Sequence, residues 1–347
     1  MKRTASVFKL LLAAIIFLQT FACKKGLVET QADSLFNESK NRSLATLTTR
    51  DIYVAGSEGG QAKYWKNGVG VTLPGGSDCY GITVVGTDVY ACGTGGDPVT
   101  GKTSAVYWKN GVPTYLPYDN SFTAFASGIA VWAGDVYVTG RIDMFSNIGV
   151  YWKNGVAINL GNGEANSISI DNGDIYIANS DASNPSYWKN GVLVPLPALS
   201  NTSVVRVVAS GGNVYATGSS GLRTKKGVLW RNGVRSELLS PTMSYGYAVA
   251  VDGFGNPVVV GTQGTSNQNI CYWANDFGSP NILGFGQQIT GRMGVTVDTQ
   301  TGEIFACGSE YPGQAMYWII SPTGSITPVP LNPTTNNAFA YAIALGQ

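Results

Sequence analysis

Short runs of apolar and β-branched residues recur from residue 51 to the end of the chain, each bounded by glycine, asparagine or aspartate. The clearest run, Tyr-Trp-Lys-Asn-Gly-Val, occurs in four close copies and three looser ones. The copies contain Trp65, Trp108, Trp152, Trp188, Trp230, Trp273 and Trp318. These tryptophans are 43, 44, 36, 42, 43 and 45 residues apart. A period near 40 residues predicts a repeat architecture.

Each repeat contains four short strands, a to d. Strand c carries the tryptophan motif and strand d, which often ends in Leu-Pro, follows it. Strand b precedes strand c with sequences such as Asp-Val-Tyr-Val-Thr-Gly, and strand a precedes strand b. The Asn-Gly pair between strands c and d is typical of a two-residue type I′ turn. Four antiparallel strands every 40 or so residues predict the blades of a β-propeller.

Strand counting predicts how the ring closes. Strands a, b and c each occur seven times, but the last strand a, at 341–345, has no strand b after it. The first strand b, at Asp51, has no clear strand a before it. We therefore predict an all-β, seven-bladed β-propeller of four-stranded antiparallel blades, closed by the C-terminal strand, which leaves no open edge. Alternatively, residues 44–48 supply the missing strand.

The N-terminus has the features of a secretory signal. A basic start is followed by an apolar run at 7–18, which is too short to span a membrane. Ala22-Cys23 resembles the lipobox of bacterial lipoproteins, although Thr20 stands where that family prefers leucine. The Cys-Lys-Lys start looks like lipoproteins of the Bacteroidota. The resemblance implies a lipidated Cys23; the alternative is an ordinary cleaved signal and a secreted protein.

These features define the predicted organisation of the chain. We expect a lipoprotein signal peptide at 1–22, a lipid-anchored flexible tether at 23–47 and the propeller at 48–347. The tether has a root-mean-square reach of roughly 25–30 Å. The expected location is the outer membrane, on its periplasmic side or at the cell surface, with Cys23 as the only membrane attachment.

Two segments carry a family resemblance. Residues 128–140 and 248–264 resemble bacterial β-propeller (SBBP) and NHL-type repeats, and residues 105–117 resemble HAF-type extracellular repeats. The chain lacks the HAF triplet, and several copies lack the aspartate before the turn. The resemblance implies an extracellular propeller and no particular activity, because such folds serve many functions.

Composition excludes several kinds of chemistry. The net charge is +1, so the chain lacks the basic footprint of a nucleic-acid-binding protein. It contains no histidine, which excludes Ser–His–Asp and Cys–His catalysis and histidine-ligated metals. No Cys-x-x-Cys motif occurs, and we expect neither a metal nor a cofactor. Cys92 and Cys307 fit small buried positions of strand b. The sequence does not decide whether Cys79 and Cys92 form a disulfide.

The repeated polar and aromatic positions each allow two interpretations. The tryptophans could form a ring of sugar-binding sites, but their recurrence in every repeat favours packing between blades. The cations beside the Asn-Gly turns could face anionic headgroups, or they could simply flank solvated hairpins, which we favour. These cations are Lys66, Lys109, Lys153, Lys189 and Arg231. The acids that begin strand b favour turns for local reasons and need no catalytic role.

Ligand recognition is expected on the rim that carries the b–c and d–a loops. These loops are longer and more variable than the a–b and c–d turns, and variable loops on a rigid scaffold usually carry recognition. The candidate ligand-binding residues there are Tyr118, Asp119, Phe122, Arg141, Asp143, Tyr245, Arg292 and Tyr311.

Arg206 is a further candidate because of its position. Strand a should be innermost, and its first positions are otherwise small: Gly81, Gly128, Ser167, Ala248, Gly294 and Ala342. The one arginine should stand at the mouth of the central channel, where its planar fork suits a carboxylate or phosphate. Alternatively, a rim acid such as Asp181 neutralises it, or water in the channel solvates it.

Three functions follow. The first is a binding or scaffolding module for a glycan or protein ligand on the long-loop rim. The second is a structural or assembly subunit without a small-molecule ligand. The third is a glycosidase or lyase, which needs two converging carboxylates. Its candidates are Asp97, Asp119, Asp143 and Glu310.

Overall fold

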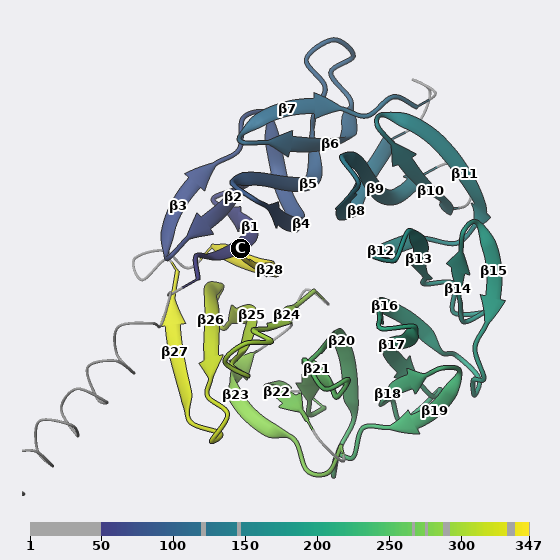
Figure 1. Cartoon of the computed structure of the whole chain (residues 1–347), viewed down its shortest axis with the longest axis vertical. Coiled ribbons are helices and arrows are strands. Elements are labelled where there is room, and N and C mark those ends of the chain that lie inside the picture. Colours follow the sequence, from purple (N-terminus) through teal and green to yellow (C-terminus); the bar gives the residue numbers. More distant parts are fainter. Residues whose placement is uncertain are drawn as a thin grey trace, which may run out of the picture. The chain divides into compact units, whose positions relative to one another are not determined.

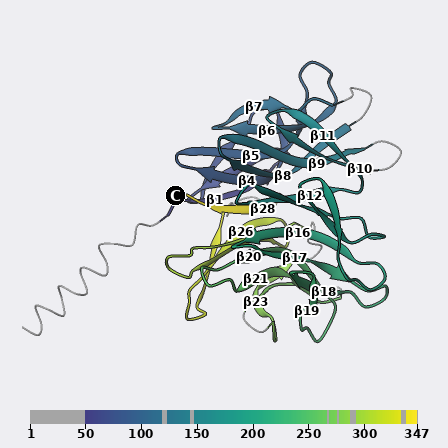
Figure 2. The same cartoon turned by 45° about the vertical axis from the view of Figure 1, so that its right-hand side comes forward.

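The computed structural model describes seven four-stranded antiparallel sheets arranged as blades around a central channel (Figure 1). The described residues are 50–118, 123–143, 147–265, 268–274, 277–286, 292–331 and 337–346. This confirms the predicted all-β, seven-bladed propeller. The turned view in Figure 2 shows the strands of successive blades stacked one after another around the ring.

The blades are numbered 1 to 7 in the order in which their strands b occur along the chain. Blade 1 contains β28 (Ala338–Leu345), β1 (Ile52–Glu58), β2 (Gln61–Lys66) and β3 (Val69–Thr72), and blade 2 contains β4 (Gly76–Val85), β5 (Asp88–Gly96), β6 (Thr103–Lys109) and β7 (Val112–Tyr115). Blade 3 contains β8 (Thr123–Trp132), β9 (Asp135–Asp143), β10 (Asn147–Lys153) and β11 (Val156–Asn162), and blade 4 contains β12 (Ala165–Asp171), β13 (Asp174–Asn179), β14 (Ser186–Lys189) and β15 (Val192–Pro195). Blade 5 contains β16 (Ser203–Ser210), β17 (Asn213–Ser220), β18 (Lys226–Arg231) and β19 (Val234–Glu237), and blade 6 contains β20 (Ser244–Val251), β21 (Pro257–Gln263), β22 (Gln268–Trp273) and β23 (Asn281–Gly286). Blade 7 contains β24 (Gly294–Val297), β25 (Ile304–Glu310), β26 (Gln314–Ile320) and β27 (Ile326–Pro330).

The C-terminal strand closes the ring as the strand count predicts. β28 pairs antiparallel with β1, from Ile52 opposite Leu345 to Glu58 opposite Ala338. Figure 1 shows the two ends of the propeller sequence meeting in this blade. The alternative strand at 44–48 lies outside the described residues, but β28 already occupies the innermost position beside β1.

The Asn-Gly turns fasten the outer hairpin of a blade to its strand b. In blade 2, Asn110 and Gly111 have φ values of 52° and 82°, as a type I′ turn requires. The Asn110 side chain accepts a hydrogen bond from the amide of Val89 at 2.8 Å and donates one to Asp88 at 2.7 Å. Lys109 adds an ion pair with Asp88 at 2.9 Å.

The same contacts recur around the ring and explain several repeated columns of the sequence. Equivalent ion pairs are Lys66–Asp51, Lys153–Asp135 and Lys189–Asp174, at 2.7, 2.8 and 2.9 Å. These four lysines therefore form no free cationic arc. Hydrogen bonds from Lys109 and Asn110 lower the pKa of Asp88. The stabilisation linked to that shift is present above the ordinary aspartate pKa and is lost as the pH falls through the lowered value.

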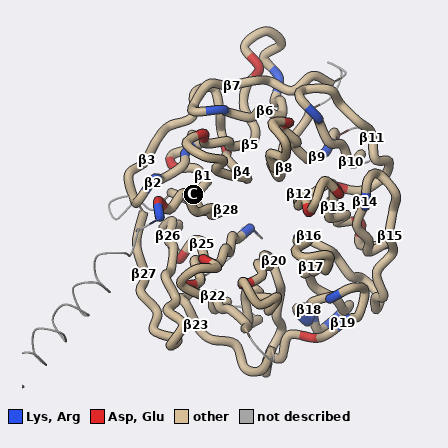
Figure 3. Tube along the Cα trace, in the orientation of Figure 1, with Lys and Arg blue, Asp and Glu red and all other residues tan. Residues whose placement is uncertain are grey.

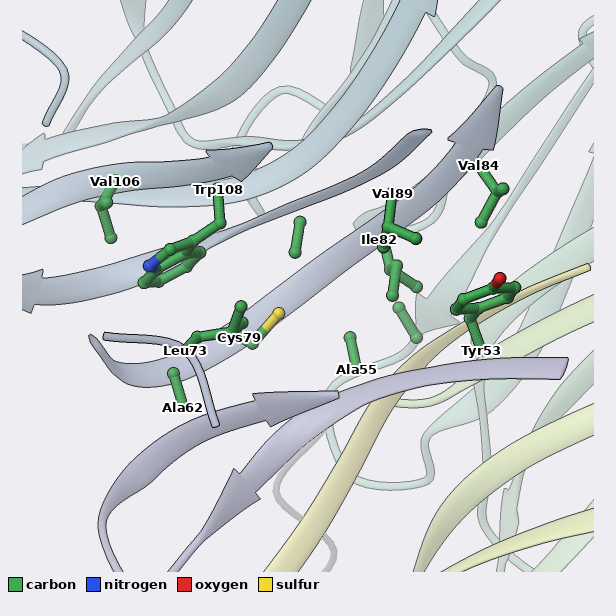
Figure 4. Packing of buried hydrophobic residues seen from close by; sticks show 12 residues of the cluster. Tyr53, Ala55, Ala62, Leu73, Cys79, Ile82, Val84, Val89, Val106 and Trp108 are labelled. Atoms are coloured by element: carbon green, nitrogen blue, oxygen red, sulfur yellow. The ribbon is translucent and has the colours of Figure 1, made fainter. Parts of the chain in front are cut away.

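The tryptophans join neighbouring blades, as the packing interpretation predicts. Trp108 is fully buried and packs near Leu73, in the chain between blades 1 and 2, and near Cys79 of β4 (Figure 4). Its indole N–H donates to the carbonyl oxygen of Pro74, in the Leu-Pro segment after strand d of blade 1, at 2.9 Å. Trp152, Trp230 and Trp273 donate to the carbonyls of Pro117, Pro197 and Leu239 at 2.9, 2.7 and 2.9 Å.

The cysteines of the described chain are buried and free. Cys79 and Cys92, whose pairing the sequence did not decide, are both free thiols. Cys92 and Cys307 have no exposed surface, which fits their prediction as small buried residues of strand b. Burial raises the pKa of the Cys92 thiol to about 12. These thiols therefore serve as packing groups.

We predict that deleting residues 340–347 destabilises the propeller by several kcal/mol. The deletion removes most of the innermost strand of blade 1 together with its pairing to β1 and its core contacts. Thermal unfolding of the purified domain measures the effect, with deletion of Gln347 alone as the control. A full deletion that melts at the wild-type temperature would show that β28 does not close the ring.

We predict that Asn110→Ala lowers the free energy of unfolding by about 1–2 kcal/mol, because it removes two hydrogen bonds and places alanine at a left-handed φ. The neighbouring Lys109→Ala change removes an exposed ion pair with Asp88 and an exposed contact with the Tyr90 ring, and should cost clearly less. Urea unfolding of both variants makes the comparison. Equal losses for the two would contradict the role given to the asparagine.

Candidate functional site

A β-bulge near the start of strand a turns one residue of a blade into the channel mouth. In β4, Cys79 pairs opposite Gly93 and Gly81 pairs opposite Cys92, so Tyr80 has no partner across the ladder. Bulges re-aim side chains and are common beside functional sites. The corresponding extra residues of blades 3, 5, 6 and 1 are Ser127, Val205, Tyr247 and Tyr341.

Blades 4 and 7 supply a residue to the channel mouth without a simple bulge. In blade 4, Asn166 lies in a wider irregularity between Ala165 and Ile168. In blade 7, Met293 immediately precedes β24. Every blade therefore supplies one residue to the same ring, and we call these seven residues the mouth ring. The mouth ring comprises Tyr80, Ser127, Asn166, Val205, Tyr247, Met293 and Tyr341.

The mouth ring encloses a cavity of about 240 Å³. Arg141, Glu164, Arg206 and Arg292 complete its lining. Pockets for drug-sized ligands usually measure about 300–1,000 Å³, so this cavity suits a smaller molecule. The cavity lies on the rim of the b–c and d–a loops, because strand a begins there and strand b ends there.

The two sides of the mouth ring differ in chemistry. Four consecutive blades, 6, 7, 1 and 2, supply three tyrosines and a methionine, whereas blades 3, 4 and 5 supply serine, asparagine and valine. Tyr245 stacks on Tyr247 with ring centroids 6.0 Å apart, and Tyr80 meets Tyr341 at 5.3 Å. The cavity thus has an aromatic arc facing a polar arc.

Arg206 forms the floor of the mouth cavity. It lines this cavity and also a second one of about 140 Å³ further along the channel. Its Nη2 donates to the carbonyl oxygen of Met293 at 3.2 Å, which connects blade 5 to blade 7. Burial, and secondarily the charge of Arg292, lower the pKa of Arg206.

No acid of the described chain forms an ion pair with Arg206 or Arg292. Asp181, which was considered as one alternative partner of Arg206, accepts a hydrogen bond from the amide of Ser183 at 2.9 Å. The guanidinium of Arg292 lies over the Tyr80 ring, 4.1 Å from its centroid, and its Nη2 lies 3.5 Å from the hydroxyl of Ser127. The cavity therefore contains two cations that form no ion pair with a described acid, although Glu164 is also part of its lining.

The third arginine of the cavity is neutralised. Arg141 donates to Asp143 at 2.8 Å and also to Glu164, and it lies 4.5 Å from the Phe125 ring centroid. Burial opposes the charged form, but the two carboxylates raise the pKa of Arg141 above its usual value. Arg141 is thus a fixed part of the wall, held by one oxygen of each carboxylate.

The structure separates the remaining predicted residues. Tyr118 lines another cavity of about 270 Å³ under the b–c loop of blade 2. Tyr311 is 64 % exposed and is not part of the mouth lining. Asp119 and Phe122 lie outside the described residues. The mouth cavity therefore brings together only Arg141, Arg206 and Arg292 of the predicted set, with Asp143 and Tyr245 directly behind its lining.

The carboxylates considered for catalysis have other contacts. Asp97 accepts a hydrogen bond from the amide of Val99 at 2.8 Å within its own turn and lines the cavity beside Tyr118. Burial raises the pKa of Glu310, which is not part of the mouth lining. Among the described residues, no three acidic, cysteine or histidine side chains are grouped in a way that could hold a metal ion.

Sequence reasoning missed the mouth ring by one residue. Each of its members stands immediately before the predicted first position of strand a, as Tyr80 stands before Gly81. Aligning the repeats from one residue earlier would have included the mouth ring. Its members differ between blades, so repetition gave no signal, and the bulge that points them inward is not visible in the sequence.

The fold is a seven-bladed β-propeller with a small cavity at its channel mouth. No family model matches the chain. No curated protein matches it. The resemblance to SBBP, NHL and HAF repeats therefore stays a prediction.

Several solved structures are similar in shape at low identity. The chain resembles the nidogen/laminin complex with 13% identity and a TM-score of 0.46, over 85% of this chain and 98% of that one. It resembles the Pseudomonas aeruginosa periplasmic gluconolactonase with 10% identity and a TM-score of 0.49, over 86% and 98%. For the WD40 β-propeller domain of Doa1 the identity is 16% and the TM-score 0.46, over 73% and 82%. The seven-blade assignment rests on the strand pairing.

Within the described ranges, no helix has the length and apolar character needed to cross a membrane.

Proposed function

We propose that the protein is a cell-envelope binding module that takes a small ligand, such as the terminal residue of a glycan, into its mouth cavity. The supporting observation is that all seven blades supply a residue to one cavity, through bulges in most of them. The propeller geometry brings these positions together, but a scaffold without a ligand would not need the asymmetry of their chemistry, with three tyrosines on one side and serine and asparagine on the other. The proposal therefore favours recognition at the rim over a purely structural role.

The contrast between repeated columns supports this proposal. The columns that are nearly identical in the blades are occupied by structural contacts: tryptophans between blades, and Asn–Asp and Lys–Asp pairs within them. The mouth ring has equivalent positions in every blade but a different residue in most. Positions that share geometry and differ in chemistry are those where a repeat protein can shape an asymmetric site.

A glycan fits the chemistry of the cavity. The aromatic arc offers flat apolar surfaces with polar tips, and Ser127 and Asn166 offer hydrogen-bonding groups on the opposite side. The lining combines these aromatic surfaces with several polar and charged side chains, which suits a ligand that is itself rich in hydroxyl groups.

We predict that Val205→Trp abolishes ligand binding by filling the cavity. Val205 is a mouth-ring residue on the polar arc, where an indole would project into the space that a ligand needs. The matched control is Val112→Trp, because Val112 is 66% exposed after a c–d turn at the other rim. Calorimetry with neutral and acidic monosaccharides should show binding by the wild type and by the control, with at least roughly 100-fold loss in Val205→Trp.

Two outcomes would overturn this proposal. Binding that survives Val205→Trp would place the ligand elsewhere. A wild-type protein that binds no glycan or monosaccharide would favour an assembly subunit.

We propose further that a lipid on Cys23 anchors the propeller to the outer membrane. The support is the basic and apolar pattern of residues 1–22, with alanine directly before the cysteine. The polar segment at 23–47 would act as the tether. SBBP- and HAF-like repeats would agree with a domain presented outside the cytoplasm.

We predict that Cys23→Ser moves the protein from the membrane fraction to the soluble fraction, because the thiol that carries the lipid is lost. Lys24→Ser, next to it, should leave the protein in the membrane fraction. Fractionation and metabolic labelling with a radioactive fatty acid measure both. Membrane retention of a Cys23→Ser protein would count against the anchor.

A further inference from the structure

Two guanidinium groups that form no ion pair with a described acid line one small cavity. Arg206 occupies a strand position where the other six blades have glycine, alanine or serine. Among the described residues, no acid forms an ion pair with it or with Arg292. Partly buried charge without a counterion is unfavourable. Such an arrangement destabilises the free protein, and an anion bound between the two cations would relieve it.

The donors of Arg206 are largely free for such an anion. A guanidinium has five N–H donors, and one hydrogen bond from Arg206 to a described residue is present, from Nη2 to Met293. The side chain reaches both the mouth cavity and the space below it. Because the side chain lines both cavities, a ligand in the channel can accept hydrogen bonds from this guanidinium.

Arg292 is held in place from the other side. Its guanidinium stacks on Tyr80 at 4.1 Å and approaches Ser127 at 3.5 Å. The planar fork of arginine matches the two oxygens of a carboxylate. An anion held from the floor by Arg206 and from the side by Arg292 would lie against the tyrosines of the aromatic arc.

Resting on the function proposed above, we infer that the mouth cavity binds a sugar acid, a single pyranose ring that carries a carboxylate. The carboxylate lies between Arg206 and Arg292. The ring lies along the arc of Tyr80, Tyr341 and Tyr247, and its hydroxyl groups face Ser127 and Asn166. The cavity of about 240 Å³ limits the ligand to about one such ring.

The third cation and its acids define the polar wall of this site. Arg141 already binds Asp143 and Glu164, so it is not free for the carboxylate. Glu164 remains part of the cavity lining, where a carboxylate oxygen can accept from a sugar hydroxyl. A neutral sugar could use this wall as well, but it would leave the two free arginines without a counterion.

The test uses D-glucuronate, methyl glucoside and inorganic phosphate as probes in calorimetry with the purified propeller. We expect the wild type to bind glucuronate roughly 10- to 100-fold more tightly than methyl glucoside, as charge-assisted hydrogen bonds imply. Arg206→Gln should remove this preference, and Arg206→Lys should restore only part of it, because a lysine lacks the fork. Arg223→Gln, which changes an exposed arginine in a b–c loop, is the matched control and should bind as the wild type does.

A thermal shift gives a second readout. Glucuronate should raise the melting temperature of the wild type with increasing concentration and should not raise that of Arg206→Gln. Without ligand, Arg206→Gln should melt close to the wild-type temperature, because no described acid loses a partner and one hydrogen bond, to the Met293 carbonyl, is removed. If Arg206→Gln fails to fold, Arg292→Gln should show the same loss of preference.

Three results would overturn the inference. In the first, methyl glucoside binds as tightly as glucuronate, and its binding persists in Arg206→Gln but is lost in Val205→Trp. The proposed binding module would then stand, but the ligand would not be a sugar acid. Equal binding of phosphate and glucuronate would show that the site recognises an anion and not the sugar ring. A lack of glucuronate binding by the wild type would overturn it directly.

Discussion

The packing of one blade against the next is the interaction on which this propeller depends. Each blade is a small four-stranded sheet that has little core of its own, so it is stable only where its two faces meet its neighbours. A buried tryptophan on strand c mediates this contact, and between described residues of four blades its indole N–H also hydrogen-bonds the chain that leaves the previous blade. Truncating a buried tryptophan typically costs about 3–5 kcal/mol, a large part of the stability of a typical domain.

The same packing crowds the axis of the ring and so determines what can line the channel. A Cβ atom added to Gly294 would lie 2.7 Å from the backbone nitrogen of Ile343, and one added to Gly128 would lie 3.2 Å from the Cα of Ser167. Inner strands of adjacent blades touch at these points, which requires glycine or another small residue. Charged residues are only 12% of the chain and are thinly scattered around the ring (Figure 3). A cationic side chain in this channel is therefore an exception, and its partial burial destabilises the folded protein.

The architecture could be predicted from the sequence because its determinants are local and repeated. The Asn-Gly turns, the tryptophan period and the unpaired strands at Asp51 and 341–345 gave the blades, their number and their closure. Arg206 could be singled out because it breaks a repeated column. The cavity itself could not be predicted, because it depends on bulges that change which residues face inward and on a contact between Arg206 and Met293, 87 positions apart. Loop variability was a weaker guide, since Tyr118 and Tyr311 prove to lie away from the cavity.

The bulges explain how a regular propeller can contain an irregular site. Without its bulge, strand a would alternate in strict register with strand b, and a residue such as Tyr80 would have a partner across the ladder. The extra residue turns toward the mouth while Gly81, immediately after it, resumes the pairing and the close approach to blade 3. The structural columns and the mouth ring are therefore adjacent in sequence but respond to separate constraints. Substitutions in the mouth ring can change the chemistry of the cavity without disturbing the tryptophans that hold the blades together. This separation is what allows seven nearly equivalent blades to place tyrosines on one side of a single cavity, polar groups on the other and an arginine beneath them.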